Sequence, residues 1–179
     1  FPGIGYHIDK PLLYYSAKLA RARGCEILAV QYPALPTGLR GHTEKIEQAV
    51  QTALSAAEEQ LTTIDWTAYD RVFFLSKSIG TAIAARYAVQ HNIHPRQVYY
   101  TPIEQALPYL DPTGIAFHGT VDPWARTELI TEGCRRLGVP LHLTENADHS
   151  METGDVLRDI TILHTILEQT DCWMRQRCI

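Results

Sequence analysis

The sequence predicts an α/β fold in which a mostly parallel central sheet lies between two layers of helices, a three-layer sandwich. Two observations predict it: short apolar segments alternate with amphipathic segments, and no internal repeat or low-complexity linker interrupts them. Strands that alternate with helices form parallel sheets with right-handed crossovers. The chain has 179 residues, 45% of them hydrophobic, which is enough for one core. We therefore expect a single domain over residues 1–179.

The expected elements follow one another in a regular order along the chain. The strands are Cys25–Tyr32, Arg71–Leu75, Gln97–Tyr100, Gly114–His118 and Leu141–Thr144. The helices are Lys10–Arg23, an amphipathic segment from Ile46 to Leu61, a packed segment from Ser78 to Ala88, and a last helix after Asp155. The residues that share one apolar face of the last helix, at spacings of three and four, are Val156, Ile160, Leu163 and Leu167.

The most specific motif is Ser76-Lys77-Ser78-Ile79-Gly80, between an expected strand and an expected helix. A serine at such a turn is a candidate nucleophile elbow, in which a tight and strained backbone exposes the hydroxyl at the end of the sheet. The turn requires small residues two positions before and after the serine. Gly80 satisfies the second position, and Ser76 replaces the more usual glycine at the first. For the pentapeptide alone, the alternative is that Ser78 only caps the helix.

Asp122 and His149 lie in loops that follow two later strands. The turn Gly119-Thr120-Val121 carries Asp122 to the end of the sheet where ligands bind in open α/β folds. The alternative is that Asp122 caps a helix that begins at Pro123. His149 lies in a polar loop, not in an apolar stripe, which favours a chemical role. Its neighbour Asp148 is a less favoured candidate for an acid that orients it, because adjacent side chains in an extended loop point apart.

Together, Ser78, Asp122 and His149 in that order, and the first residues Phe1-Pro2-Gly3-Ile4-Gly5, resemble small α/β-hydrolases of the serine esterase and lipase type. The resemblance runs over essentially the whole chain. It implies the α/β-hydrolase fold and a catalytic triad. In that triad Ser78 is the nucleophile, His149 the base, and Asp122 the acid that orients the base.

The resemblance also implies an oxyanion hole made by backbone N–H groups. One donor is the amide of Ile79, immediately after the nucleophile. The other comes from the first loop, in which Pro2 stands where the family has histidine. This register assigns the amide of Ile4, with that of Gly5 as the alternative. Because the sequence shows no strand before this loop, we expect an N-terminal strand to precede Phe1.

The substrate pocket is expected to be open. Many members of the superfamily insert a helical lid between the strands that correspond to Gln97–Tyr100 and Gly114–His118, but here only about a dozen residues separate them, the length of an ordinary connection. We therefore expect a minimal core without a large lid. The residues that the resemblance places around the pocket are Gly5, Tyr6, Lys77, Thr101 and Trp124, with His7, Ile103 and Glu104 also at its border. For Trp124, the alternative is packing beside the acid loop.

The expected function is that of a serine hydrolase, which cleaves a small carboxylic ester or a thioester through an acyl-enzyme intermediate. No cofactor is expected. An alternative of a different class is a catalytically idle α/β-hydrolase scaffold that binds a small molecule or a partner protein, since fold does not determine function. A third interpretation is an acyltransferase that uses an alcohol in place of water.

Composition argues against several other kinds of partner. The net charge is −4 without long runs of either sign, so neither nucleic acid nor a membrane surface is expected to bind. No apolar stretch approaches the roughly 20 residues of a membrane span. His91 and His94 lack a nearby carboxylate or cysteine, so no metal site is expected. Scattered cysteines favour a cytoplasmic location, although Cys172 and Cys178 offer a pair for an oxidising compartment. Nothing indicates a homo-oligomer.

Overall fold

A computed structural model describes residues 1–175 of the chain. Cys178, and with it the pair considered for Cys172, lies outside the described residues. At the centre is a four-stranded sheet whose neighbouring strands are all parallel and follow the order of the sequence. The strands are β1 (Phe73–Lys77), β2 (Arg96–Tyr100), β3 (Ile115–Gly119) and β4 (Leu141–Thr144).

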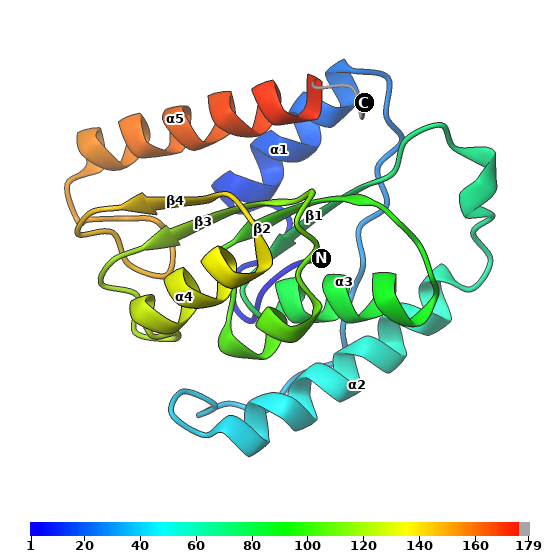
Figure 1. Ribbon diagram of the computed structural model, residues 1–179, viewed down its shortest axis with the longest axis horizontal. Helices are drawn as coiled ribbons and strands as arrows, with labels where there is room; N and C mark the ends of the chain where they lie inside the picture. The colour runs from blue at the N-terminus through cyan, green and yellow to red at the C-terminus, as the bar shows by residue number, and fades with distance from the viewer. Residues whose placement is uncertain (176–179) are drawn as a thin grey trace.

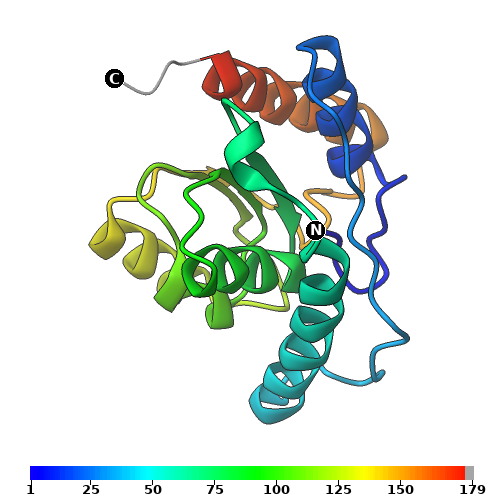
Figure 2. The same ribbon diagram turned by 90° about the vertical axis from the view of Figure 1, so that its right-hand side faces the viewer.

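Helices cover both faces of this sheet (Figure 1). They are α1 (Pro11–Ala22), α2 (Thr43–Leu61), α3 (Ile79–Gln90), α4 (Thr127–Leu137) and α5 (Val156–Arg175). Figure 2 shows α1 and α5 on one face and α3 and α4 on the other, with α2 packed outside α3. Among residues 1–175, none of the helices combines the length and the apolar character that a membrane-crossing helix needs. The predicted three-layer α/β fold is confirmed.

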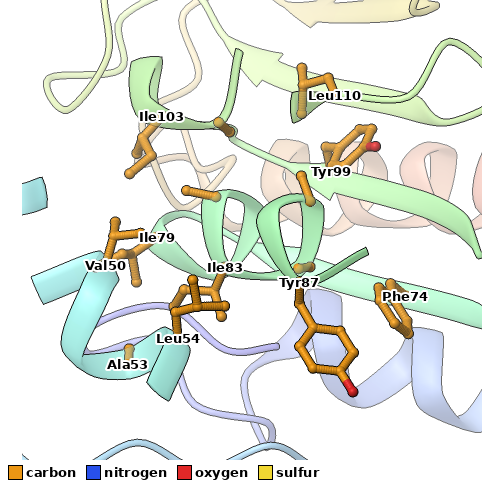
Figure 3. Close-up of a cluster of buried hydrophobic side chains, with 14 of the residues drawn as sticks. Val50, Ala53, Leu54, Phe74, Ile79, Ile83, Tyr87, Tyr99, Ile103 and Leu110 are labelled. Atoms are coloured by element: carbon orange, nitrogen blue, oxygen red, sulfur yellow. The ribbon is translucent and has the colours of Figure 1, made fainter. Parts of the chain in front are cut away.

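The helix α3 is the centre of the larger hydrophobic cluster. Its residues 79–88 are all buried. Figure 3 shows Ile79 of α3 beside Val50 of α2, and Ile83 beside Leu54. Because these residues are buried on every side of the helix, α3 is held between the sheet and α2. Ser78, which directly precedes α3, therefore stands on a fixed support.

A second cluster fills the space between the sheet, α1 and α5. The hydroxyl group of Tyr100 on β2 lies at its centre, 2.7 Å from the Oγ of Ser16 on α1 and 2.8 Å from the Oγ1 of Thr170 on α5. All three side chains are buried. These hydrogen bonds satisfy polar groups that would otherwise be costly to bury, and they connect both helices to the sheet.

The predicted strand Cys25–Tyr32 is wrong, because this segment forms no strand within residues 1–175. A strand requires a neighbour with which its backbone can pair. The backbone of Gln31 pairs with the side chain of Gln60 on α2. The edge of β1 pairs with Phe1, whose amino group donates to the carbonyl of Leu75 and whose carbonyl accepts from the amide of Lys77.

Two other elements differ in detail from the prediction. The strand predicted at Arg71–Leu75 continues to Lys77, two residues further. The apolar face predicted for the last helix is wrong at its start, since Val156 and Ile160 are exposed. The buried side chains of α5 belong to its C-terminal half, which lies beside α1 (Figure 1). Packing against α1, which periodicity alone does not locate, decides which face is buried.

Candidate active site

Ser78 occupies the sharp turn between β1 and α3. Its backbone has φ 56° and ψ −126°, a conformation that costs a residue with a side chain roughly 1–3 kcal/mol. Its N–H donates to the carbonyl oxygen of Tyr100 at 2.9 Å, which ties the turn to the end of β2. The side chain makes no capping hydrogen bond to α3. The turn thus presents the hydroxyl outward, and helix capping does not account for the serine.

The loops after β3 and β4 bring Asp122 and His149 to the same end of the sheet as Ser78. The Nε2 of His149 lies 2.7 Å from the Oγ of Ser78, and its Nδ1 lies 2.7 Å from the Oδ2 of Asp122. Both imidazole nitrogens are therefore engaged, one by a hydroxyl and one by a carboxylate. This arrangement can move a proton away from the serine while the carboxylate stabilises the charged ring.

The sequence left open whether Asp122 caps a helix and whether Asp148 is the acid that orients His149, and the geometry answers both questions. The Oδ1 of Asp122 accepts a hydrogen bond from the amide of Trp124 at 2.8 Å, but α4 begins only at Thr127, so Asp122 closes a local turn and does not cap the helix. The Oδ1 of Asp148 accepts from the amides of Ser150 and Glu152 within its own loop. Asp122 is thus the carboxylate that contacts His149.

The electrostatics of the site favour a neutral histidine beside an ionised aspartate. Burial tends to raise the pKa of Asp122, but hydrogen bonds from His149 and the Trp124 amide, together with the charges of the neighbouring histidines, hold that pKa below its usual value. Burial and the charge of Lys77 lower the pKa of His149, while Asp122 opposes them. Near neutral pH, His149 is therefore able to accept a proton.

Three glycines allow the loops of the site to come close together. A Cβ atom on Gly3 would lie 2.9 Å from the Cβ of Ser78, and one on Gly80 would lie 2.5 Å from the carbonyl oxygen of Pro2. A Cβ atom on Gly119 would lie 2.6 Å from the carbonyl oxygen of Asp148. Real Cβ atoms do not come this close to other heavy atoms. The first loop, the serine turn and the two later loops therefore pack at distances that only glycine permits.

The first loop forms a tight turn beside the serine. Gly3 and Tyr6 exchange two backbone hydrogen bonds, and Gly5 has the positive φ of 69° that the third position of a type II turn requires. Among residues 1–175, the amides of Ile4 and Ile79 donate to no acceptor. Both residues line the same cavity as Ser78. Two residues with unengaged backbone amides thus lie at the cavity beside Ser78.

A small cavity of about 40 Å³ adjoins the serine and the histidine. The residues that line it besides Ser78 and His149 are Ile4, Leu39, Ile46, Ile79, Ile103 and Trp124. Apart from Ser78 and His149, its wall therefore consists of hydrophobic residues. Among residues 1–175, no cluster of three or more metal-ligating side chains is found at this site or elsewhere.

The structure places the five expected pocket residues in different environments. Trp124 lines the cavity, and its ring lies 5.7 Å from that of His149. Lys77 and Thr101 do not line it, because both are fully buried beneath the site. Tyr6 is also buried, and its hydroxyl accepts a hydrogen bond from the Leu12 amide. Gly5 is exposed on the turn and outside the cavity.

The sequence did not point to two residues of the cavity wall. Leu39 comes from the turn-rich stretch before α2, and Ile46 is the first residue of the apolar stripe of that helix. An apolar residue in such a stripe is normally read as core. Ile46 lines the cavity, and does not only pack in the core, because the start of α2 lies beside the serine turn.

No protein-family model and no curated protein matches the chain. Solved structures do match it. Est1E from Butyrivibrio proteoclasticus, solved with ferulic acid bound, is similar with a TM-score of 0.60 at 14% identity, covering 94% of this chain and 87% of that one. A carboxylesterase from Bacillus cereus is similar with a TM-score of 0.56 at 16% identity, covering 90% and 81%.

A serine hydrolase without a lid from Xanthomonas campestris is similar with a TM-score of 0.50 at 12% identity, covering 92% of this chain and 76% of that one. These likenesses show that the chain has the α/β-hydrolase fold, as its sequence predicts. The connection between β2 and β3 holds a single 3₁₀ helix, Glu104–Tyr109, where a lid would be inserted. The predicted minimal core without a large lid is confirmed.

The close approach of the acid and histidine loops gives a prediction for stability. Gly119→Ala places a methyl group against the backbone of the histidine loop, which cannot yield easily. We expect a loss of about 1–3 kcal/mol in the free energy of unfolding, the usual cost of overpacking. Chemical denaturation followed by circular dichroism measures it.

Gly133→Ala on α4 is the matched control. Its Cβ would meet only the flexible side chain of Leu107, and alanine favours the helix by about 1 kcal/mol. This variant should be as stable as the wild type. Equal stability of the two variants would contradict the role given to Gly119.

Proposed function

We propose that the protein is a serine hydrolase that cleaves esters of short, apolar carboxylic acids. One observation carries the proposal: Ser78, His149 and Asp122 form an unbroken chain of hydrogen bonds whose serine end opens into a small apolar cavity. A serine hydroxyl is a weak nucleophile until a base within hydrogen-bond reach removes its proton. The likeness in fold to a carboxylesterase supports an ester as the substrate.

The first half of the reaction transfers the acyl group to the enzyme. The Oγ of Ser78 attacks the ester carbonyl carbon while the Nε2 of His149 takes the hydroxyl proton. Asp122 stabilises the resulting imidazolium through Nδ1. The carbonyl oxygen becomes an oxyanion that accepts hydrogen bonds from the amides of Ile4 and Ile79. The bond to the leaving alcohol then breaks, and His149 gives the proton to the departing oxygen.

The second half of the reaction releases the acid. A water molecule attacks the acyl-enzyme carbonyl, and His149 takes its proton. The same two amides stabilise the second oxyanion. When this intermediate collapses, the bond between the acyl carbon and the Oγ of Ser78 breaks, and His149 returns the proton to the serine. The carboxylic acid leaves and the free enzyme is restored.

The size and lining of the cavity support a short acyl group. A volume of about 40 Å³ holds roughly three water-sized groups at ~10–15 Å³ each. Apart from His149, no side chain of its wall can carry a charge that would bind a charged substituent. We therefore assign the cavity to an unbranched acyl chain of about two to four carbons.

The acyl-chain assignment is tested with a series of p-nitrophenyl esters from acetate to octanoate. For the wild type, kcat/KM should be highest at about two to four carbons and fall for longer chains, which do not fit the cavity. Ile103→Ala removes three carbons from the cavity wall and should move the maximum toward longer chains. The exposed Leu129 on α4 offers the control: Leu129→Ala should leave the maximum in place. A maximum at octanoate in the wild type would contradict the assignment.

The identity of the acid that orients His149 is tested with two matched substitutions of aspartate by asparagine. Asp122→Asn keeps the shape of the side chain but removes the charge that stabilises the imidazolium, so kcat should fall by about 10³–10⁴-fold. Asp148→Asn retains the oxygen that accepts from Ser150 and Glu152, and it should lose less than about tenfold. Steady-state hydrolysis of the best ester measures both. Similar losses in the two variants would exclude Asp122 as the specific partner of His149.

A further inference from the structure

Lys77 is the last residue of β1 and directly precedes the serine. Its side chain is fully buried, which is rare for lysine unless the charge is paired. The Nζ atom donates to the Oγ1 of Thr101 at 2.5 Å and lies 4.7 Å from the centre of the Tyr6 ring. Within residues 1–175, no carboxylate comes within 4.0 Å of it. A hydroxyl and an aromatic face, and not an ion pair, therefore hold this ammonium group.

The backbone of Thr101 is strained at the point where it receives Lys77. Thr101 follows β2, has a φ of 43°, and is fully buried. A positive φ is a marked outlier for a β-branched residue. Such strain is kept where the surroundings enforce it, and it concentrates at functional sites. The amide of Thr101 donates to the carbonyl of Phe117 at 2.7 Å, which holds the strained residue in place. The strain at Thr101 is thus a second, independent observation that the surroundings of the Lys77 ammonium group are held in a fixed conformation.

Lys77 directly precedes Ser78, and its buried ammonium group interacts through its charge with His149 and Asp122. The ionisable groups that act on Lys77, on His149, or on both are His118, Asp122 and Asp148, and the Lys77 ammonium group faces the ring of Tyr6. Burial lowers the pKa of Lys77 to about 7, while Asp122 and Asp148 oppose the shift. The buried Nδ1 of His118 lies 3.6 Å from the Oδ2 of Asp122 and has no hydrogen-bond partner among the described residues.

We propose that Lys77 is a positioning residue whose buried positive charge keeps His149 neutral, and therefore able to act as a base, in acidic solution. The proposal rests on the hydrolase function proposed above. It requires no contact between Lys77 and the substrate. The charge acts through the low-dielectric interior, where like charges repel more strongly than in water.

The sign of the effect follows from the two titrations. Below a pH of about 7 Lys77 carries its proton, so a second positive charge on His149 is disfavoured and the imidazole stays neutral to lower pH. Above that pH, Lys77 loses its proton and no longer opposes the imidazolium that forms during the reaction. Removal of Lys77 should therefore raise the pKa of His149 and reduce activity on the acidic side only.

The test measures how fast a fluorophosphonate probe labels Ser78 as a function of pH, in the wild type and in Lys77→Met. The midpoint of the acidic limb should rise by roughly one pH unit, the lower end of what a nearby charge produces. Labelling should then be slower below both midpoints, by less than about tenfold because loss of the Lys77 charge also favours the imidazolium that forms during labelling, and unchanged on the alkaline plateau. Lys18→Met removes an exposed lysine from α1 and should leave the profile unchanged. An unshifted midpoint in folded Lys77→Met would overturn the proposal.

If Lys77→Met does not fold, the pH profile of labelling is measured in a second variant, Thr101→Val. Valine keeps the branched shape of threonine but removes the acceptor of the Lys77 ammonium, so the midpoint should rise in the same direction by a smaller amount. An unchanged midpoint would count against the proposal.

A second readout separates this proposal from the hydrolase function. The titration of His149, followed by nitrogen-15 NMR in the wild type and the same variants, needs no chemistry at Ser78. Absence of labelling at every pH in the wild type would refute the hydrolase function. A His149 titration that is the same with and without the Lys77 charge would refute the role of Lys77.

Discussion

The strained backbone of Ser78 is the constraint on which the rest of the site depends. A residue with a side chain does not hold a φ of 56° unless its surroundings compensate. Three features supply that compensation. The carbonyl of Tyr100 accepts the serine amide, Gly80 lets the first loop lie directly against the turn, and the fully buried start of α3 fixes the helix that follows. The hydroxyl is consequently held at the open end of the sheet.

The partners of the serine are placed by the topology of the sheet. Parallel strands in the order β1 to β4 bring the ends of β1, β3 and β4 to one edge, so loops that are far apart in sequence meet there. Gly119 lets the loops of Asp122 and His149 approach to a distance at which the carboxylate contacts the imidazole. Behind them, Lys77 and His118 place further ionisable groups in the interior. The chemistry of the site therefore depends on buried charges as well as on the three contacting side chains.

The sequence predicted the parts of this arrangement that depend on local patterns. A serine between a buried strand and a helix, and polar residues directly after two later strands, located Ser78, Asp122 and His149 in loops that the structure brings together. Pairing partners and packing faces were not predictable in the same way. The segment Cys25–Tyr32 has the composition of a strand, but its backbone finds no strand to pair with among residues 1–175.

The position of Lys77 shows why one error in a boundary matters. The strand was expected to end at Leu75, which would leave Lys77 in an exposed loop beside the substrate. Because β1 continues to Lys77, the alternation of side chains along a strand turns it to the same face as Leu75, toward α1 and Tyr6. A shift of two residues thus converts an expected pocket residue into a buried charge.

The central claim is that His149 activates Ser78, and covalent labelling tests it most directly. The protein is incubated with a fluorophosphonate probe, digested, and analysed by tandem mass spectrometry. The account predicts a single adduct on Ser78 that forms in the wild type and is lost in a folded His149→Gln variant. Folded wild-type protein that carries no adduct, or an adduct that forms equally well without His149, would contradict it.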